Sequence, residues 1–164
     1  MDLNQKLSEN FSLREFVKSD TAVRLGIDNT PTEEQVQKLK DLCENVIQPA
    51  RNHFGSIRIN SGYRCVELCE AVGSNGHSNH AYALAGDIEA NDPNISNFKL
   101  LLWIYENCEF KELIAEFFDN EDPKGGWVHV AYEKGNNKRE LKLKDKTHNY
   151  THVTIDELKS LYKA

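Results

Sequence analysis

Three residues of the kinds that bind transition metals occur in apolar or tightly turned parts of the sequence. His80 ends the polar segment GSNGHSNH (residues 73–80), and Asp87 follows inside the apolar segment LAGDIEA (84–90). His129 lies in a second apolar segment, WVHV (127–130). Imidazole nitrogen and carboxylate oxygen both bind Zn²⁺, at roughly 2.0–2.2 Å. The three residues therefore predict a zinc site whose fourth position is left for water, as in catalytic zinc centres.

Each of these residues also has an ordinary explanation when it is taken alone. A single buried histidine is more often a hydrogen-bonded core residue than a ligand, and an aspartate in a strand can cap a neighbouring turn. Asp87 nevertheless stands in an apolar segment, where an unpaired carboxylate is costly. The joint occurrence of the three residues favours a metal.

The candidate ligands fall on or beside predicted strands. Alternating or apolar runs bounded by Gly, Asn, Asp and Pro predict strands at residues 56–60, 84–90, 112–117, 127–132 and 140–144. A strand over 127–132 places Trp127, His129 and Ala131 on one face. Short helices are expected over residues 65–72 and 96–107.

Helix starts are marked by side chains with the spacing of capping boxes. The pairs are Ser12 with Glu15, Thr30 with Pro31 and Glu33, and Thr154 with Glu157. After Thr30, apolar side chains recur at helical spacing as far as Ala50, which predicts one long amphipathic helix over the core. Pro49 should kink this helix or limit its last turns.

The order of elements and the composition predict one small α+β domain. Helices come first and mostly antiparallel strands follow, so we expect N-terminal helices packed on a mostly antiparallel sheet. The 164 residues, 39% of them hydrophobic, fit a single domain over 1–164. We place its core at about 11–132, with C-terminal strands and a helix over 139–162.

Charge and hydropathy exclude several classes of function. The net charge of −6 argues against a nucleic-acid surface, which needs concentrated Lys and Arg. No apolar run approaches the ~18 residues of a membrane span, and Met1–Asn10 lacks the apolar stretch of a secretory signal. We therefore expect a protein made in the cytoplasm, not inserted in a membrane, and monomeric.

The four cysteines match neither a disulfide framework nor a paired zinc motif. Buried or reduced thiols are expected, with a disulfide or a second metal site as the alternatives. The residues concerned are Cys43, Cys65, Cys69 and Cys108.

With these motifs the sequence resembles the M15 peptidases. This family includes D-alanyl-D-alanine carboxypeptidases and phage endolysins that cleave L-alanyl-D-glutamate bonds. The resemblance covers about Phe11–Tyr132 and rests on SGYR (61–64), on SNHAYALAGD (78–87) and on WVH (127–129). The family pattern S-x-H-x-x-G-x-A-x-D is matched except at Ala83, where glycine is usual. The opening NFSLREF (10–16) is similar to members from phage and prophage genomes.

The resemblance implies a Hedgehog/DD-peptidase-like fold and a Zn²⁺ ion held by His80, Asp87 and His129. It further implies a bound water as nucleophile and Arg64 near the substrate carbonyl or carboxylate. Zinc lowers the pKa of such a water to about 7 and polarises the scissile carbonyl. Further candidates for substrate binding are Ser78, His77 and Trp127.

The general base is where the sequence departs from many relatives. They carry a glutamate three residues before the last histidine, and that position is Gly126 here. Glu116 is the predicted substitute, because an antiparallel pairing of 112–117 with 127–132 would bring it close to His129. Rival carboxylates in the connecting loop are Asp119, Glu121 and Asp122.

The sequence therefore predicts a zinc-dependent peptidase acting on peptidoglycan peptides, as a D-Ala-D-Ala carboxypeptidase or a murein endopeptidase. Its expected place of action is the bacterial cell wall or periplasm, as a phage or prophage product. The departure at Gly126 motivates an alternative, a non-catalytic zinc-stabilised wall-binding or virion structural module.

Overall fold

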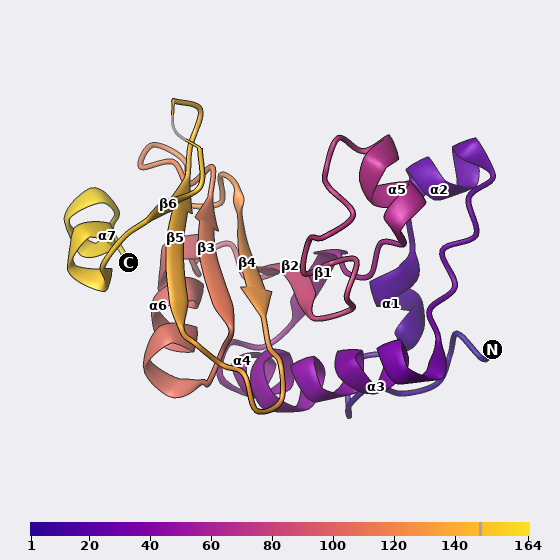
Figure 1. Cartoon of the computed structure of the whole chain (residues 1–164). Helices are drawn as coiled ribbons and strands as arrows, with labels where there is room; N and C mark the ends of the chain where they lie inside the picture. The colour runs from indigo at the N-terminus through magenta and orange to yellow at the C-terminus, as the bar shows by residue number, and fades with distance from the viewer. Residues whose placement is uncertain (148) are drawn as a thin grey trace.

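A mixed six-stranded sheet forms the centre of the molecule, which the computed structural model describes over residues 1–147 and 149–164 (Figure 1). The strands lie in the order β1-β2-β4-β3-β5-β6. Their bounds are Ile57–Ser61, Ala85–Ala90, Glu112–Glu116, Trp127–Ala131, Glu140–Lys144 and Thr151–His152 for β1 to β6. Each end of the first five strands lies within one residue of the predicted end.

Helices surround this sheet and complete an α+β domain, as predicted. Their bounds are Leu13–Val17 (α1), Asp20–Leu25 (α2), Glu33–Leu42 (α3), Cys43–Ile47 (η1), Gln48–Phe54 (α4), Val66–Ala71 (α5), Asn97–Asn107 (α6) and Ile155–Leu161 (α7). Among the described residues, no helix combines the length and apolarity needed to cross a bilayer.

The capping predictions hold at two helices and fail at the third. The Glu15 carboxylate accepts a hydrogen bond from the Ser12 N–H at 2.8 Å. The Glu157 carboxylate accepts one from the Thr154 N–H at 2.7 Å. The long helix, however, is capped by Thr32, whose hydroxyl accepts from the Gln35 N–H, and not by Thr30. Thr32 has a glutamine three residues later and therefore forms a capping box of its own.

The long helix continues past Pro49 and is neither ended nor shortened there. Between α3 and α4 the chain makes the π-helical turn η1, in which the Gln48 N–H donates to the Cys43 carbonyl. Pro49 then occupies the first turn of α4, where a missing N–H costs no helical hydrogen bond. A π turn thus lies directly before the proline, and the helix runs on as far as Phe54.

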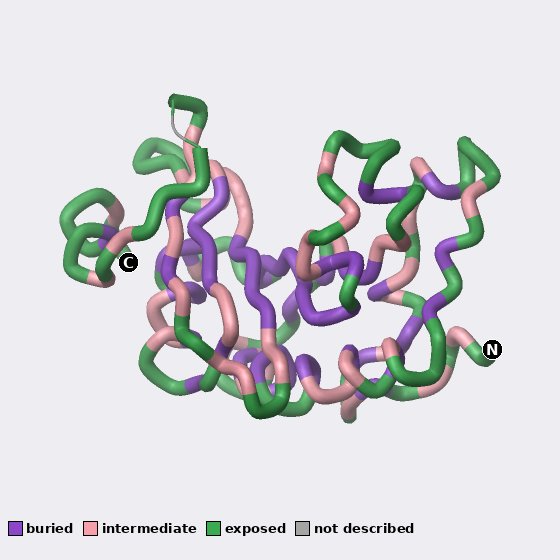
Figure 2. Tube along the Cα trace, viewed as in Figure 1, coloured by how far each residue is buried: buried purple, intermediate pink, exposed green. Residues whose placement is uncertain are grey.

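The period of two along the strands separates the sheet into an apolar and a polar face. The apolar side chains belong to the core, and α6 packs across β2, β3 and β4 (Figure 1). Figure 2 shows the buried residues concentrated along the strands, whereas α7 buries only Leu158. The polar face carries Asp87, Glu112, Glu116 and His129. Carboxylates and an imidazole are therefore gathered on one side of a rigid sheet.

Strand register brings the candidate ligands together. β2 and β4 pair antiparallel with Asp87 opposite His129, and β3 and β4 pair antiparallel with Ile114 opposite His129. The sheet is mostly antiparallel as predicted, but β5 lies parallel to β3, with Lys142 opposite Ile114. This parallel pair makes the sheet mixed and places the C-terminal segment beside the polar face.

The loop that carries His80 is fixed by two tight backbone features. Gly62 packs against α1 so closely that a Cβ there would lie 2.6 Å from the Phe16 carbonyl oxygen. Ala83 adopts a left-handed conformation with φ of 59°. Left-handed backbone favours glycine, which explains why the family pattern has glycine at this position. The alanine here retains the conformation despite its Cβ.

All four cysteines are free thiols in the structure, as expected. Cys43, Cys69 and Cys108 are buried, and Cys65 is half-buried. Within the described residues, the one group of three potential metal ligands contains no cysteine, so no second metal site is found there.

Candidate metal centre

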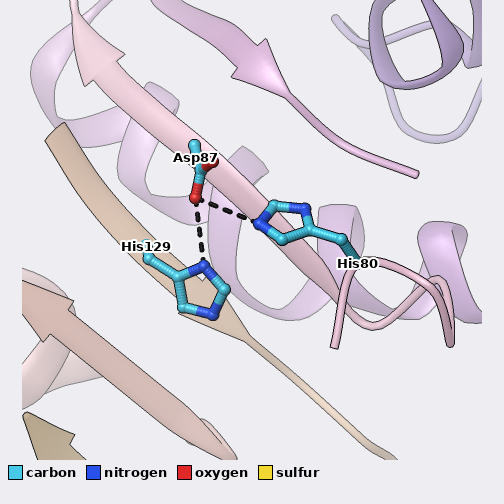
Figure 3. Close-up of side chains that lie close together, drawn as sticks. All are labelled: His80, Asp87 and His129. Atoms are coloured by element: carbon cyan, nitrogen blue, oxygen red, sulfur yellow. Dashed lines mark hydrogen bonds and ion pairs between the residues drawn. The ribbon is translucent and has the colours of Figure 1, made fainter. Parts of the chain in front are cut away.

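His80, Asp87 and His129 converge on one point of the polar face (Figure 3). The Oδ1 atom of Asp87 lies 3.3 Å from Nε2 of His80 and 3.0 Å from Nδ1 of His129. One ligand atom of each residue lies within 4.8 Å of the others, and all three side chains are buried. The structure thus brings together the three residues that the sequence singled out.

The donor set and its spacing suit a zinc ion. Tetrahedral ligands at roughly 2.0–2.1 Å from zinc stand about 3.3 Å apart, close to the two separations from Asp87 Oδ1. His80 Nδ1 donates to the Gly62 carbonyl at 2.6 Å, so the nitrogen that faces Asp87 is the one with the lone pair. His129 Nε2 lies 3.0 Å from a carboxylate oxygen of Glu112. Each imidazole is therefore held by its outer nitrogen.

The electrostatics of the cluster favour a positive charge at its centre. Burial by itself would raise the pKa of Asp87, but a charge on His80 and the close contacts with both imidazoles lower it below its usual value. Burial by itself would lower the pKa of His129, yet hydrogen bonds to Asp87 and Glu112 raise it to about 10. Burial dominates at His80 and lowers its pKa. A metal cation would take the place of the proton on His129.

Glu116 lies beside this cluster without a hydrogen bond to it. Its Oε1 atom lies 4.0 Å from His129 Nδ1, and only 8% of the side chain is exposed. Burial is the largest cause that raises the pKa of Glu116, from 4.5 to about 7, against the opposing charge of His129. A carboxylate with a pKa near neutrality, beside a buried polar cluster, suits general acid and base chemistry.

The backbone around Gly126 leaves no room for a side chain at this position. Its φ is +70°, and a Cβ there would lie 2.0 Å from the carbonyl oxygen of Glu116. The glutamate that many relatives carry at this position would therefore require a different backbone. Glu116 approaches the same cluster from the neighbouring strand.

A cavity of about 610 Å³ opens over the cluster. Its floor is the polar face of the sheet, and its walls are the loop after α5 on one side and the C-terminal segment on the other. Arg64 and Trp127 line it, and their Nε and Nε1 atoms are buried with no hydrogen-bond partner among the described residues. Two residues of the cavity wall therefore each hold a buried donor without a partner.

The remaining predicted substrate contacts, His77 and Ser78, also line this cavity, but they differ in exposure and in hydrogen bonding. His77 is exposed, and its Nδ1 lies 3.0 Å from the Tyr82 hydroxyl. The Ser78 hydroxyl contacts the Cys69 thiol and the Ala81 N–H, so it already has partners within the loop. The rival carboxylates Asp119, Glu121 and Asp122 do not line the cavity.

Four titratable residues of the cavity were not singled out from the sequence, namely Glu112, Lys142, Lys144 and Tyr150. The alternation in 112–116 and 140–144 put each glutamate and lysine on a definite strand face. The parallel pairing of β5 with β3, which turns the lysines toward the cluster, has no local signal in the sequence. Tyr150 lies in the connection between β5 and β6. The Lys144 Nζ atom lies 4.5 Å from the centre of the Tyr150 ring.

Comparison with known families identifies a related family. The model of the peptidase M15 family matches residues 9–131, which hold all three cluster residues as well as Arg64 and Glu116. The match ends before β5, so Lys142, Lys144 and Tyr150 lie beyond it. No curated protein matches the chain.

Proposed function

This chain belongs to the peptidase M15 family, and on that premise we propose that it is a zinc metallopeptidase that hydrolyses peptide bonds in the peptidoglycan stem peptide. The observation that carries the proposal is the buried convergence of His80, Asp87 and His129 beneath a cavity. Two imidazole nitrogens and one carboxylate form the donor set of many hydrolytic zinc sites, with room for a further ligand.

In the proposed mechanism, His80, Asp87 and His129 would hold the zinc ion, and each would have a defined role. Asp87 supplies the negative charge, and the two histidines supply neutral nitrogens whose orientation is fixed by Gly62 and Glu112. When bound, zinc lowers the pKa of a water molecule to about 7 and polarises the scissile carbonyl. Burial of the three ligands strengthens these electrostatic effects.

Glu116 is the proposed general base and acid. As a carboxylate it would accept the proton of the attacking water, and as a carboxylic acid it would return that proton to the leaving amine. Its position 4.0 Å from His129 Nδ1 and its pKa near 7 support both steps. This arrangement supports an enzyme despite the departure at Gly126, which motivated the non-catalytic alternative.

Arg64 and Trp127 are the proposed substrate contacts nearest the chemistry. The guanidinium would bind the substrate carbonyl or carboxylate, and the indole N–H would donate to a peptide carbonyl. His77 and Ser78 would contact the substrate from the loop wall.

Two cationic side chains of the cavity support an anionic peptide as substrate. Arg64 and Lys144 both line it, and neither has a carboxylate within ion-pair distance among residues 1–147 and 149–164. Stem peptides of peptidoglycan carry carboxylates, on a terminal D-alanine or on D-glutamate. The substrate would place the action of the protein at the bacterial cell wall, and the similarity of residues 10–16 to phage members extends the proposal to a phage or prophage product.

A digest of defined muropeptides with the zinc-loaded protein tests this proposal. Release of D-alanine would identify a carboxypeptidase, and cleavage within the stem an endopeptidase. Absence of any product, from protein that binds zinc stoichiometrically, would favour the non-catalytic module instead. Loss of cleavage in His80→Ala protein is the matching control.

A further inference from the structure

We propose that Glu112 is a positioning residue that holds His129 with its Nδ1 atom directed at the candidate metal centre. This inference rests on the proposed function, because it assigns a role toward the zinc ion. Glu112 itself is not among the three clustered ligands. Its role would be exerted through the imidazole that it contacts.

Strand register places two glutamates on either side of His129. Ile114 lies directly opposite His129 in the β3–β4 pair, so Glu112 and Glu116 are its diagonal neighbours on the same face. The Oε1 atom of Glu112 lies 3.0 Å from His129 Nε2, whereas Oε1 of Glu116 lies 4.0 Å from Nδ1. The two carboxylates thus approach opposite nitrogens of one ring, and only Glu112 is within hydrogen-bond distance.

The surroundings of Glu112 determine which nitrogen of His129 carries the proton. The Asn79 amide donates to Oε1 at 2.9 Å, and the Lys142 ammonium donates to Oε2 at 2.6 Å. Both oxygens therefore act as acceptors, so His129 Nε2 must be the donor. In the neutral ring the lone pair then lies on Nδ1, which is the atom 3.0 Å from Asp87.

His80 provides an internal comparison. It is oriented by a backbone carbonyl at its Nδ1 atom and presents Nε2 to Asp87. His129 is oriented by a carboxylate at Nε2 and presents Nδ1. Hydrogen bonding to a carboxylate fixes the tautomer and also makes the imidazole a stronger donor to a metal. The two histidines therefore need different partners, and Glu112 is the one that a side-chain substitution can remove.

Lys142 extends this arrangement into a part of the chain beyond the family match. It lies on β5, next to β3, and its ammonium contacts both Glu112 and Glu140. The parallel β3–β5 pair thus supplies the cation that keeps a half-buried carboxylate in place beside His129. We infer that the C-terminal segment contributes to metal binding without providing a ligand.

The test is Glu112→Gln, with zinc affinity measured by chelator competition. Lys142 would draw the glutamine oxygen toward itself and turn the amide group toward His129 Nε2, which would then become an acceptor. We expect zinc binding weaker by about 10- to 100-fold. Because zinc on Nδ1 leaves the proton on Nε2, we also expect an upfield shift of the Nε2–H signal of His129 in long-range ¹H–¹⁵N spectra of the zinc-loaded protein, where this N–H has lost its carboxylate acceptor. Glu140→Gln is the matched control, because it changes the same lysine pair without touching His129.

A double variant separates positioning from packing. In Glu112→Gln with Lys142→Met the glutamine oxygen is free to accept from Nε2 again, so zinc affinity should recover by severalfold over Glu112→Gln alone. If Glu112→Gln fails to fold, Lys142→Met alone should still weaken zinc binding about threefold or more.

Three results would overturn the inference. Wild-type affinity and an unchanged His129 spectrum in folded Glu112→Gln protein would remove the positioning role and leave the proposed function intact. Unchanged affinity in Lys142→Met, if only that variant folds, would do the same. A wild-type protein that binds no zinc would overturn the proposed function, and this inference with it.

Discussion

Asp87 and His129 face each other across the β2–β4 pair, with Oδ1 of the aspartate 3.0 Å from Nδ1 of the histidine. Two of the three clustered side chains are therefore fixed by the hydrogen bonds of the sheet itself. The third, His80, comes from a loop, and the Gly62 carbonyl holds its ring at 2.6 Å. Such a cluster is organised before any ligand arrives, which reduces the cost of binding.

Glu116→Gln should abolish most of the peptidase activity without releasing zinc. The glutamine keeps the shape of the side chain but cannot accept the proton of the attacking water. General base catalysis typically contributes about 10²- to 10⁴-fold, so kcat should fall by that order while zinc content stays stoichiometric. Glu121→Gln, in the exposed loop between β3 and β4, is the control and should leave kcat unchanged. Equal activity of Glu116→Gln and wild type would refute the assignment.

The activity should rise with pH through the ionisation of Glu116. Its pKa is raised from 4.5 to about 7, mainly by burial, and only the carboxylate form can act as base. A bound zinc ion would lower this pKa, so the midpoint of the acidic limb of kcat/KM should lie below about 7. Rates measured between pH 4 and pH 8 at saturating zinc check this; a rate that falls over that interval would contradict it.

The same pKa predicts that Glu116→Gln stabilises the metal-free protein at high pH. Because the folded state holds the proton more tightly than the unfolded state, stability falls as pH rises from 4.5 to about 7, and the penalty is complete above that. The shift corresponds to at most roughly 3 kcal/mol. Urea unfolding of chelator-treated protein at pH 5 and pH 8 should show the variant more stable only at pH 8. A variant less stable than wild type at pH 8 would speak against a buried, uncompensated carboxylate.

Gly126→Ala should destabilise the protein and disturb Glu116. The added Cβ would lie 2.0 Å from the Glu116 carbonyl oxygen, on top of the strain of a left-handed alanine. Gly135→Ala isolates that strain, because Gly135 also has a positive φ but nothing within 4 Å of its Cβ position. We expect about 1 kcal/mol for Gly135→Ala and clearly more for Gly126→Ala, with activity lost only in the latter. Similar unfolding curves for both variants would contradict the predicted clash between a Cβ at position 126 and the Glu116 carbonyl oxygen.

Much of the site could be predicted from residue type and strand alternation. Asp87 in an apolar strand and His129 in another marked the cluster, and the loop between β3 and β4 predicted the hairpin that carries Glu116 toward His129. Local capping signals located α1 and α7 directly. For α3, both Thr30 and Thr32 stand near the start of the helix. The cap was predicted at Thr30, but Thr32 forms it.

The parts that could not be predicted depend on long-range packing. Nothing near Lys142 indicates that β5 will lie parallel to β3, because that pairing depends on the path of the intervening chain. The left-handed backbone at Ala83 was hidden because alanine rarely adopts it. The support of His129 by Glu112 and Lys142 follows from these tertiary contacts.

The most direct test of the metal centre is the zinc content of Asp87→Asn protein, measured beside Glu89→Gln after dialysis. Glu89 lies on the same strand and is also buried, but it pairs with Arg58 at 2.7 Å and takes no part in the cluster. We predict stoichiometric zinc in wild type and Glu89→Gln, and none in Asp87→Asn, which should also cleave no muropeptide. Zinc retained at wild-type affinity by Asp87→Asn would contradict a centre built from His80, Asp87 and His129.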